Sequence, residues 1–256
     1  MFEGLDLSES SIVILMRLLS LFIDQVSTPP VLRHRILWLI GCHTHRIPAD
    51  CRRHLYVAIA SVLNDPTNDH GNDMNVKLVA VRTLQNFLYD PDDSVDVLCT
   101  HIEDLIASLY RVATDCEELN SQTNALTCVS LAISTMAGLG VNISESAANA
   151  AVMPLSAVWE NAVGQYSSLR RDILSILTSV AVAIGKDLAP RLTPVALPAI
   201  DQSLNPSYQD QNLVLVEDAL TLWLTLLRFA SGITPEWGNL FLRAHDVLSV
   251  DLENTK

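Results

Sequence analysis

The sequence predicts an all-α fold, an α-α superhelix in which antiparallel helix pairs are stacked in order. Apolar residues recur at three- and four-residue spacing through nearly the whole chain, which is the period of an amphipathic helix. The 256 residues include only 9 Gly and 5% aromatic residues, a bias toward helix over sheet. Hydrophobic residues make up 49% of the chain, enough to bury a substantial core.

Breaks rich in Pro, Gly, Asn and Asp separate the helical runs and allow them to be counted. The count gives about eleven helices and no convincing strand. The predicted ranges are 10–24, 30–44, 49–64, 73–89, 94–113, 117–139, 144–163, 166–185, 187–203, 211–230 and 234–250.

Start and stop signals support several of these ranges. Ser144 followed by Glu145 is typical of a helix start, and the Gly138-Leu139-Gly140 segment before it is typical of a helix end. Thr234-Pro235-Glu236 is a second clear start, because Thr caps free amides and proline suits the first helical turn. Prolines at the remaining junctions fall between helices or at their edges, namely Pro29, Pro30, Pro48, Pro91 and Pro206.

Similar amphipathic segments return along the chain, namely LRHRILWLI, NVKLVAVRTL, a weaker QTNALTCVSL, SLRRDILSIL and LVEDALTLWL. Their spacing of roughly 42 to 47 residues is the helix-pair period of HEAT and armadillo arrays. Asp73 to Leu84 is the best copy, with Asp73 as the expected cap. We therefore expect residues 1–256 to be one HEAT-repeat solenoid segment, a fragment of a longer array. An ordinary helix bundle is the alternative.

The charge balance disfavours two kinds of partner. Sixteen basic and 29 acidic residues give a net charge of -13, which repels nucleic acid and anionic membranes and attracts basic proteins. Five scattered cysteines do not resemble a disulfide framework, and the acidic N-terminus does not resemble a signal peptide. The longest apolar stretches, 12–23 and 173–184, are too short to span a bilayer.

Several segments resemble the karyopherin-β nuclear transport receptors, in particular the importin eleven group and its fungal counterparts. The two more specific ones are Arg35-Ile-Leu-Trp38-Leu-Ile-Gly41 and Glu217-Asp218-Ala-Leu-Thr-Leu-Trp223-Leu224. The others are Leu55-Tyr56 with Ala58 and Ile59, Leu169-Arg170 with Ile173-Leu174, Leu197-Pro198 with Ile200, and Ile233-Thr234-Pro235-Glu236.

The resemblance implies a central piece of a receptor of HEAT repeats. Such a receptor carries cargo with basic signals through nuclear pores in a Ran-dependent manner. It works in the cytoplasm and nucleus, and it contacts Ran and nucleoporins through the full-length protein. A scaffold or adaptor solenoid without a transport role is the alternative function. Glycine-rich phosphate loops, nucleophile elbows and zinc-protease helices are absent from the sequence, so we expect no catalysis and no cofactor.

Acidic residues gather at predicted helix junctions. Carboxylates at helix starts are commonly caps, and the functional alternative is an acidic lining that attracts basic cargo. We predict that such a cargo site includes Asp90, Asp92, Asp93, Glu117 and Glu118.

Two further groups of residues have competing interpretations. Cys42, His45, Cys51 and His54 have the residue types of a tetrahedral zinc site, but partly buried thiols and turn histidines are the simpler interpretation. Trp38 and Trp223 occupy corresponding repeat positions, where we expect them to pack between helices. Trp159 and Trp237 are less constrained, and exposure would let them stack on cationic side chains.

Overall fold

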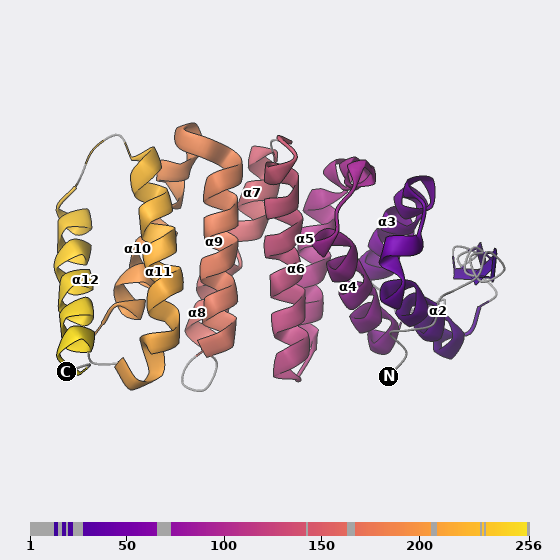
Figure 1. Ribbon diagram of the computed structural model, residues 1–256, viewed down its shortest axis with the longest axis horizontal. Helices are drawn as coiled ribbons and strands as arrows, with labels where there is room; N and C mark the ends of the chain where they lie inside the picture. Colours follow the sequence, from indigo (N-terminus) through magenta and orange to yellow (C-terminus); the bar gives the residue numbers. More distant parts are fainter. Residues whose placement is uncertain are drawn as a thin grey trace. The chain divides into compact units, whose positions relative to one another are not determined.

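The structure is a computed structural model that describes residues 13–14, 17–18, 20–22, 28–65, 73–141, 143–162, 167–205, 209–230, 232 and 234–254. Over these residues all regular secondary structure is helical (Figure 1), which confirms the predicted fold class. The α-helices are α2 (Pro30–Cys42), α3 (Ala49–Asn64), α4 (Met74–Tyr89), α5 (Ile102–Asp115), α6 (Leu119–Gly138), α7 (Glu145–Val152), α8 (Leu155–Asn161), α9 (Ser167–Leu188), α10 (Thr193–Ser203), α11 (Gln209–Phe229) and α12 (Pro235–Asn254). Short 3-10 segments are η1 (Thr44–Arg46), η2 (Asp93–Thr100) and η3 (Ala189–Leu192).

The chain divides into two compact units, residues 1–116 and 117–256, and each is described by itself. The first unit contains α2 to α5, and the second contains α6 to α12. Most of the predicted helix 10–24 lies outside the described residues.

In the first unit, α2 packs against α4, and α3 packs against both α4 and α5. Gly41 marks the close approach of α2 and α4, since a Cβ atom there would lie 3.0 Å from the Thr83 hydroxyl oxygen. The Thr83 hydroxyl donates to the Leu37 carbonyl oxygen over 3.0 Å, and the Asn86 amide donates to that of Gly41 over 3.0 Å. These bonds fix the register of two helices whose remaining contact is largely apolar.

Arg52, at the start of α3, is a buried cation that joins three segments of the first unit. Its guanidinium donates to the carbonyl oxygens of Ile47, Thr44 and Asp90, at 3.0, 2.9 and 2.9 Å. It lies 5.4 Å from the centre of the Phe87 ring, a cation–π distance. Because those carbonyls belong to the η1 turn and to the end of α4, Arg52 ties the start of α3 to both.

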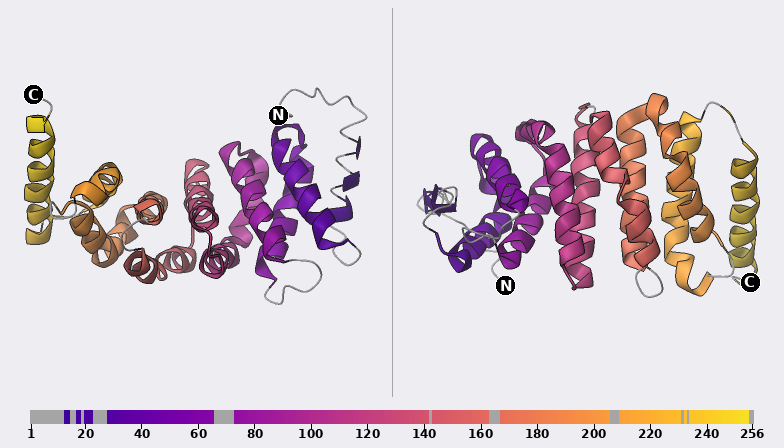
Figure 2. Two further views of the ribbon diagram at one scale, coloured as in Figure 1. Left: turned by 90° about the horizontal axis from the view of Figure 1, so that it is seen from below. Right: turned by 180° about the vertical axis from the view of Figure 1, so that it is seen from behind.

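In the second unit, α6, α9 and α11 run side by side, each contacting the next (Figure 1 and Figure 2). Polar side chains cross these apolar interfaces. The Ser130 hydroxyl of α6 lies 2.8 Å from that of Ser175 and 2.9 Å from that of Ser179, both on α9. Between α9 and α11, Arg171 pairs with Asp218 at 3.0 Å. The other helices cover this row, because α7 and α8 pack on α9, α10 packs on α11, and α12 packs on α10.

The sequence separations of these contacts equal the predicted repeat period. Leu37 and Thr83 are 46 residues apart, and Ser130 and Ser175 are 45 apart. Trp159 and its partner Gln202 are 43 apart. Contacts between residues one repeat apart are what stacked helix pairs produce, and they distinguish a solenoid from a closed bundle.

The helix starts follow the predicted chemistry at several places. The Asp73 carboxylate accepts from the Val76 amide over 2.9 Å, and Ser144 accepts from the Ala147 amide over 3.1 Å. Gly140, with a φ of 72°, follows the end of α6, in the left-handed conformation that glycine adopts easily.

Three predicted boundaries were wrong. The predicted helix 144–163 is two helices, α7 and α8, separated at Pro154, whose ring and missing amide interrupt a helix. The predicted helix 94–113 begins as the 3-10 segment η2 and becomes α-helical only at Ile102. The helix predicted to start at residue 187 starts at Thr193, after a change of direction at Gly185, where φ is 65°.

Of the two tryptophans predicted to pack between helices, Trp223 does so and Trp38 does not. Trp38, expected to pack between helices, is 45% exposed. Trp223 is half-buried, with its ring 6.3 Å from that of Phe241. Trp159 and Trp237, for which we considered exposure, are only 9% and 5% exposed. Trp159 does stack with a cation, although it is buried: the Arg170 guanidinium lies 4.8 Å from the centre of the Trp159 ring. The indole nitrogen of Trp159 donates a hydrogen bond to Gln202.

Asp172 is a largely buried carboxylate of α9 that accepts a 3.0 Å hydrogen bond from Thr127 of α6. Burial raises the pKa of Asp172 to about 7, because the charged form is poorly solvated there. The Thr127 hydrogen bond and the nearby Arg171 lower this pKa, and Asp218 raises it.

We predict that replacing Arg52 with Ala lowers the free energy of unfolding by roughly 2–4 kcal/mol, since one buried and two partly buried carbonyls lose a charged donor. Arg53→Ala is the matched control, because Arg53 forms an exposed pair with Asp96 and should cost less than about 1 kcal/mol. Urea denaturation measures both variants. Equal stabilities of the two variants would contradict the role given to Arg52.

We also predict a pH-dependent contribution to stability from Asp172. Between pH 3.8 and about pH 7 the folded chain retains a proton on this carboxyl that the unfolded chain has released. The free energy of unfolding should therefore fall as pH rises through that window. Asp172→Asn should flatten this dependence, which denaturation at a series of pH values measures. An unchanged slope in the variant would show that Asp172 titrates normally.

Candidate functional site

The five predicted cargo-binding residues are divided between the two units. Asp90 follows the last residue of α4, Asp92 lies in the turn after it, and Asp93 begins η2, all in the first unit. Glu117 and Glu118 directly precede α6 in the second unit. The structure therefore describes two acidic junctions, each at the end of one helix or the start of another.

At the first junction, part of the acidic charge is neutralised by arginines of α3. Arg52 lies 3.8 Å from the Asp90 carboxylate and 3.3 Å from that of Asp92. Asp92 is half-buried beside this cation, whereas the Asp90 side chain is 66% exposed. The exposed Arg53 pairs with Asp96 at 3.2 Å. The side chain of Asp93 lies outside the described residues.

At the second junction, both carboxylates are exposed. Glu118 accepts a 2.7 Å hydrogen bond from the hydroxyl of Ser121, the third residue of α6. Glu117 and Glu118 therefore present negative charge to solvent close to the positive end of the α6 dipole.

The sequence interpretation missed the two arginines that face the acidic residues. The signal was present, because Arg52 and Arg53 precede Asp90 to Asp96 by 38 to 43 residues, close to one repeat period. Opposite charges one period apart are expected to meet in a stack of helix pairs.

The four residues considered for zinc do not converge. Cys42 is exposed at the end of α2, and His45, in η1, accepts a hydrogen bond from Arg46 at 3.1 Å. His54 lies on α3, where its ring contacts the carbonyl oxygen of Asp50 at 2.9 Å. Among the described residues, no three His, Cys, Asp or Glu side chains are grouped as metal ligands.

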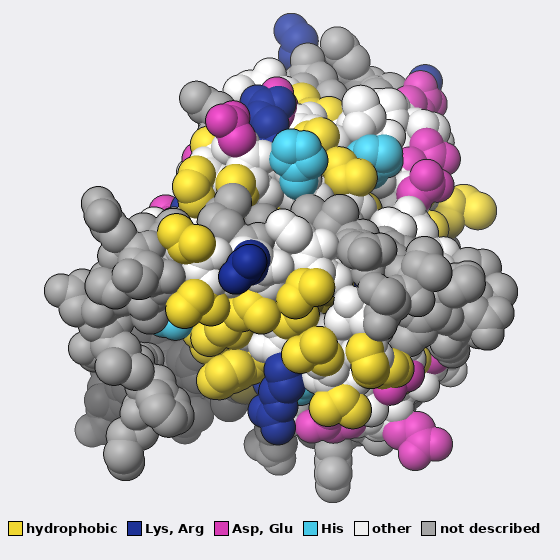
Figure 3. All heavy atoms as spheres, turned by 90° about the vertical axis from the view of Figure 1, so that its right-hand side faces the viewer, with side chains coloured by type: hydrophobic (Ala, Val, Ile, Leu, Met, Phe, Trp, Pro, Cys, Tyr) yellow, Lys and Arg dark blue, Asp and Glu magenta, His cyan; other side chains and the backbone are white. Residues whose placement is uncertain are grey.

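Helix α2 carries three large apolar side chains that are exposed. Val31, Leu32 and Trp38 are 75%, 44% and 45% exposed. Figure 3 views that end of the chain and shows hydrophobic side chains gathered in one area with a few Lys and Arg side chains between them.

The described helices include none long and apolar enough to cross a bilayer.

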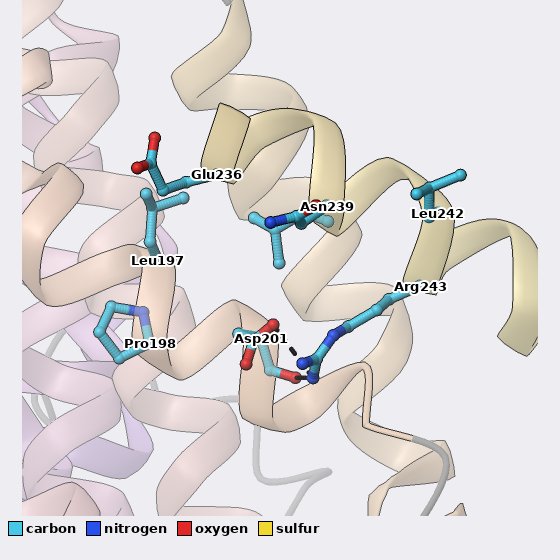
Figure 4. Close-up of a pocket in the computed structure, with 8 residues that line it drawn as sticks. Leu197, Pro198, Asp201, Glu236, Asn239, Leu242 and Arg243 are labelled. Carbon is cyan, nitrogen blue, oxygen red and sulfur yellow. Dashed lines mark hydrogen bonds and ion pairs between the residues drawn. The ribbon is translucent and has the colours of Figure 1, made fainter. Parts of the chain in front are cut away.

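A groove of about 680 Å³ lies between α10 and α12 (Figure 4). One wall is formed by Leu197, Pro198 and Asp201 of α10. The other wall is formed by residues of α12, namely Glu236, Asn239, Leu240, Leu242 and Arg243. Arg243 bridges the two walls by pairing with the Asp201 carboxylate at 3.1 Å.

Comparison with known proteins gives a consistent result. Residues 171–256 match a family model described as importin-11-like TPR repeats. Importin-11 of Mus musculus is 27% identical over 227 residues, covering 88% of this chain and 22% of the relative. Importin-11 of Homo sapiens is 28% identical over 227 residues, with the same coverage. The chain thus spans about a fifth of the length of these curated relatives, and no solved structure matches.

The matched family region begins inside α9 and contains α10 to α12, and so both walls of the groove. Although that family is described as TPR repeats, the contacts here recur at 42 to 47 residues, longer than the roughly 34-residue TPR period and typical of HEAT pairs. The comparisons confirm the resemblance that the sequence motifs indicate, because the chain is similar to importin-11 over 88% of its length.

Proposed function

We propose that this chain provides HEAT-repeat surface for binding cargo proteins in a nuclear transport receptor of the importin-β type. The observation that carries this proposal is the similarity to importin-11, which extends over 88% of the chain. In this proposal the chain catalyses nothing and needs no cofactor. It works in the cytoplasm and nucleus, and contacts with Ran and nucleoporins belong to the full-length receptor.

The stacked fold suits such a role because each helix pair adds exposed surface next to its neighbour's. Solenoids of this kind bind extended partners over several successive repeats. The net charge of -13 supports a basic cargo, since it increases the rate of encounter with cationic proteins.

Within this proposal, Asp90, Asp92, Asp93, Glu117 and Glu118 remain the predicted contacts for basic cargo. Their contributions should differ. Glu117 and Glu118 are exposed, whereas Asp92 also faces the buried Arg52. Removing the Asp92 carboxylate should therefore disturb the fold as well as any cargo contact, and the glutamates are the cleaner test.

We expect cargo captured from extract by the full-length receptor to be lost when Ran loaded with GTP is added. The reason is that importin-type receptors release their cargo when they bind that form of Ran. Quantitative mass spectrometry of pull-downs with and without the loaded GTPase makes the measurement, with GDP-loaded Ran as the control. Captured partners that are unaffected by Ran-GTP would favour a scaffold without a transport role.

We expect the double variant Glu117→Gln with Glu118→Gln to weaken binding of a basic cargo several-fold at low salt, since exposed ion pairs are each worth about 0–1 kcal/mol. The difference should shrink as salt increases. Binding measured by calorimetry is compared with the double variant Asp104→Asn with Glu160→Gln, which removes the same charge from exposed positions outside the predicted site. Equal affinities for the two double variants would show that Glu117 and Glu118 do not contribute to cargo binding.

A further inference from the structure

The groove between α10 and α12 exists because α10 is short and interrupted. α10 has 11 residues, whereas α12 has 20 and α11 has 21. Pro198 lies inside α10, so one helical hydrogen bond is missing there. Its ring forms part of the groove wall in place of a longer side chain (Figure 4). A short helix with small and cyclic side chains leaves space that the longer neighbouring helix does not fill.

A second hollow of about 350 Å³ lies beside the groove, near the start of α12. Leu197 and Glu236 line both hollows, and the buried Trp237 lines the second. The two hollows therefore adjoin at these shared residues. The volume of the groove between α10 and α12 is in the range of ligand-binding sites.

The groove has an apolar centre and two differently charged ends. Leu197, Pro198 and Leu240 provide the apolar surface, and exposed Leu242 extends it along α12. At one end Arg243 is paired with Asp201. At the other end Glu236 is fully exposed, and in the described part of the chain no cation pairs with it.

Glu236 is an ionised acceptor for a cation. Hydrogen bonds from Thr234 and from its own backbone amide lower the pKa of Glu236. Because Arg243 and Asp201 neutralise each other, the charge left at the groove is that of Glu236. Anionic ligands would be repelled both there and by the net charge of -13.

We propose that this groove binds an extended peptide segment of a partner protein in which a Lys or Arg is flanked by Leu-type side chains. The apolar side chains lie against Leu197, Pro198 and Leu240, and the cation pairs with Glu236. The side-chain amide of Asn239, on α12 like Glu236, can form hydrogen bonds with the peptide backbone. The inference goes beyond the transport proposal and does not depend on it, because a scaffold could use the same groove.

The probe is a fluorescein-labelled peptide, Gly-Ser-Leu-Lys-Leu-Gly-Ser, whose binding to the whole chain is followed by fluorescence anisotropy. Two control peptides replace Lys with Glu, or both Leu residues with Ser. We expect binding of the first peptide only, weakened by salt. Binding of the Glu peptide at equal affinity, or no binding of the first peptide at millimolar chain, overturns the proposal.

Substitutions in the chain locate the site. Glu236→Gln should weaken binding of the Lys peptide by roughly two- to fivefold, and Asn239→Lys should abolish it by placing a cation in the groove. Asp246→Asn is the matched control, because it removes an exposed carboxylate of α12 that does not line the groove, and it should bind as the parent does. Equal affinity of all three variants overturns the proposal.

A measurement on the parent chain covers the case in which a variant unfolds. Methyl NMR spectra recorded with the Lys peptide should show shifts at Leu197, Leu240 and Leu242. Shifts confined to other leucines overturn the proposal. None of these experiments involves Ran or cargo, so their failure leaves the transport proposal standing, and the reverse is also true.

Discussion

Hydrogen bonds between residues one repeat apart are the constraint on which the rest of this structure depends. Apolar helix faces can pack in more than one register, because burial of apolar surface has no direction. The bonds from Thr83 to Leu37 and from Thr127 to Asp172 do have direction, and each is satisfied in one register only. They align neighbouring helices and so decide which side chains line each groove and junction.

The same repeat spacing limits how much of the acidic surface is available to a partner. A net charge of -13 suggests abundant free carboxylates, yet Arg52 faces Asp90 and Asp92 from the preceding helix pair. The exposed Glu117, Glu118 and Glu236 are different, because in the described residues no arginine or lysine pairs with them. Their charge can act on a partner's cations.

Local signals predicted the fold well, and contacts distant in sequence were predicted poorly. Asp73 and Ser144 cap helices as expected because a cap depends on three adjacent residues. Trp38 was placed wrongly because burial of a helix face depends on which other helix covers it, and periodicity does not name that helix. The break at Pro154 was missed although its cause is local. The groove depends on the unequal lengths of α10 and α12, which no short segment reveals.

The two hydrogen bonds of Ser130 determine how the interface between α6 and α9 tolerates small displacements of these helices. Its hydroxyl reaches both Ser175 and Ser179, which lie one helical turn apart on α9. When α9 slides slightly along α6, one of these bonds lengthens while the other still satisfies Ser130. Small displacements within the register that Thr127 and Asp172 define therefore need not leave this buried hydroxyl without a partner. With a single partner, the same displacement would leave the Ser130 hydroxyl unpaired, at a cost of about 1–3 kcal/mol.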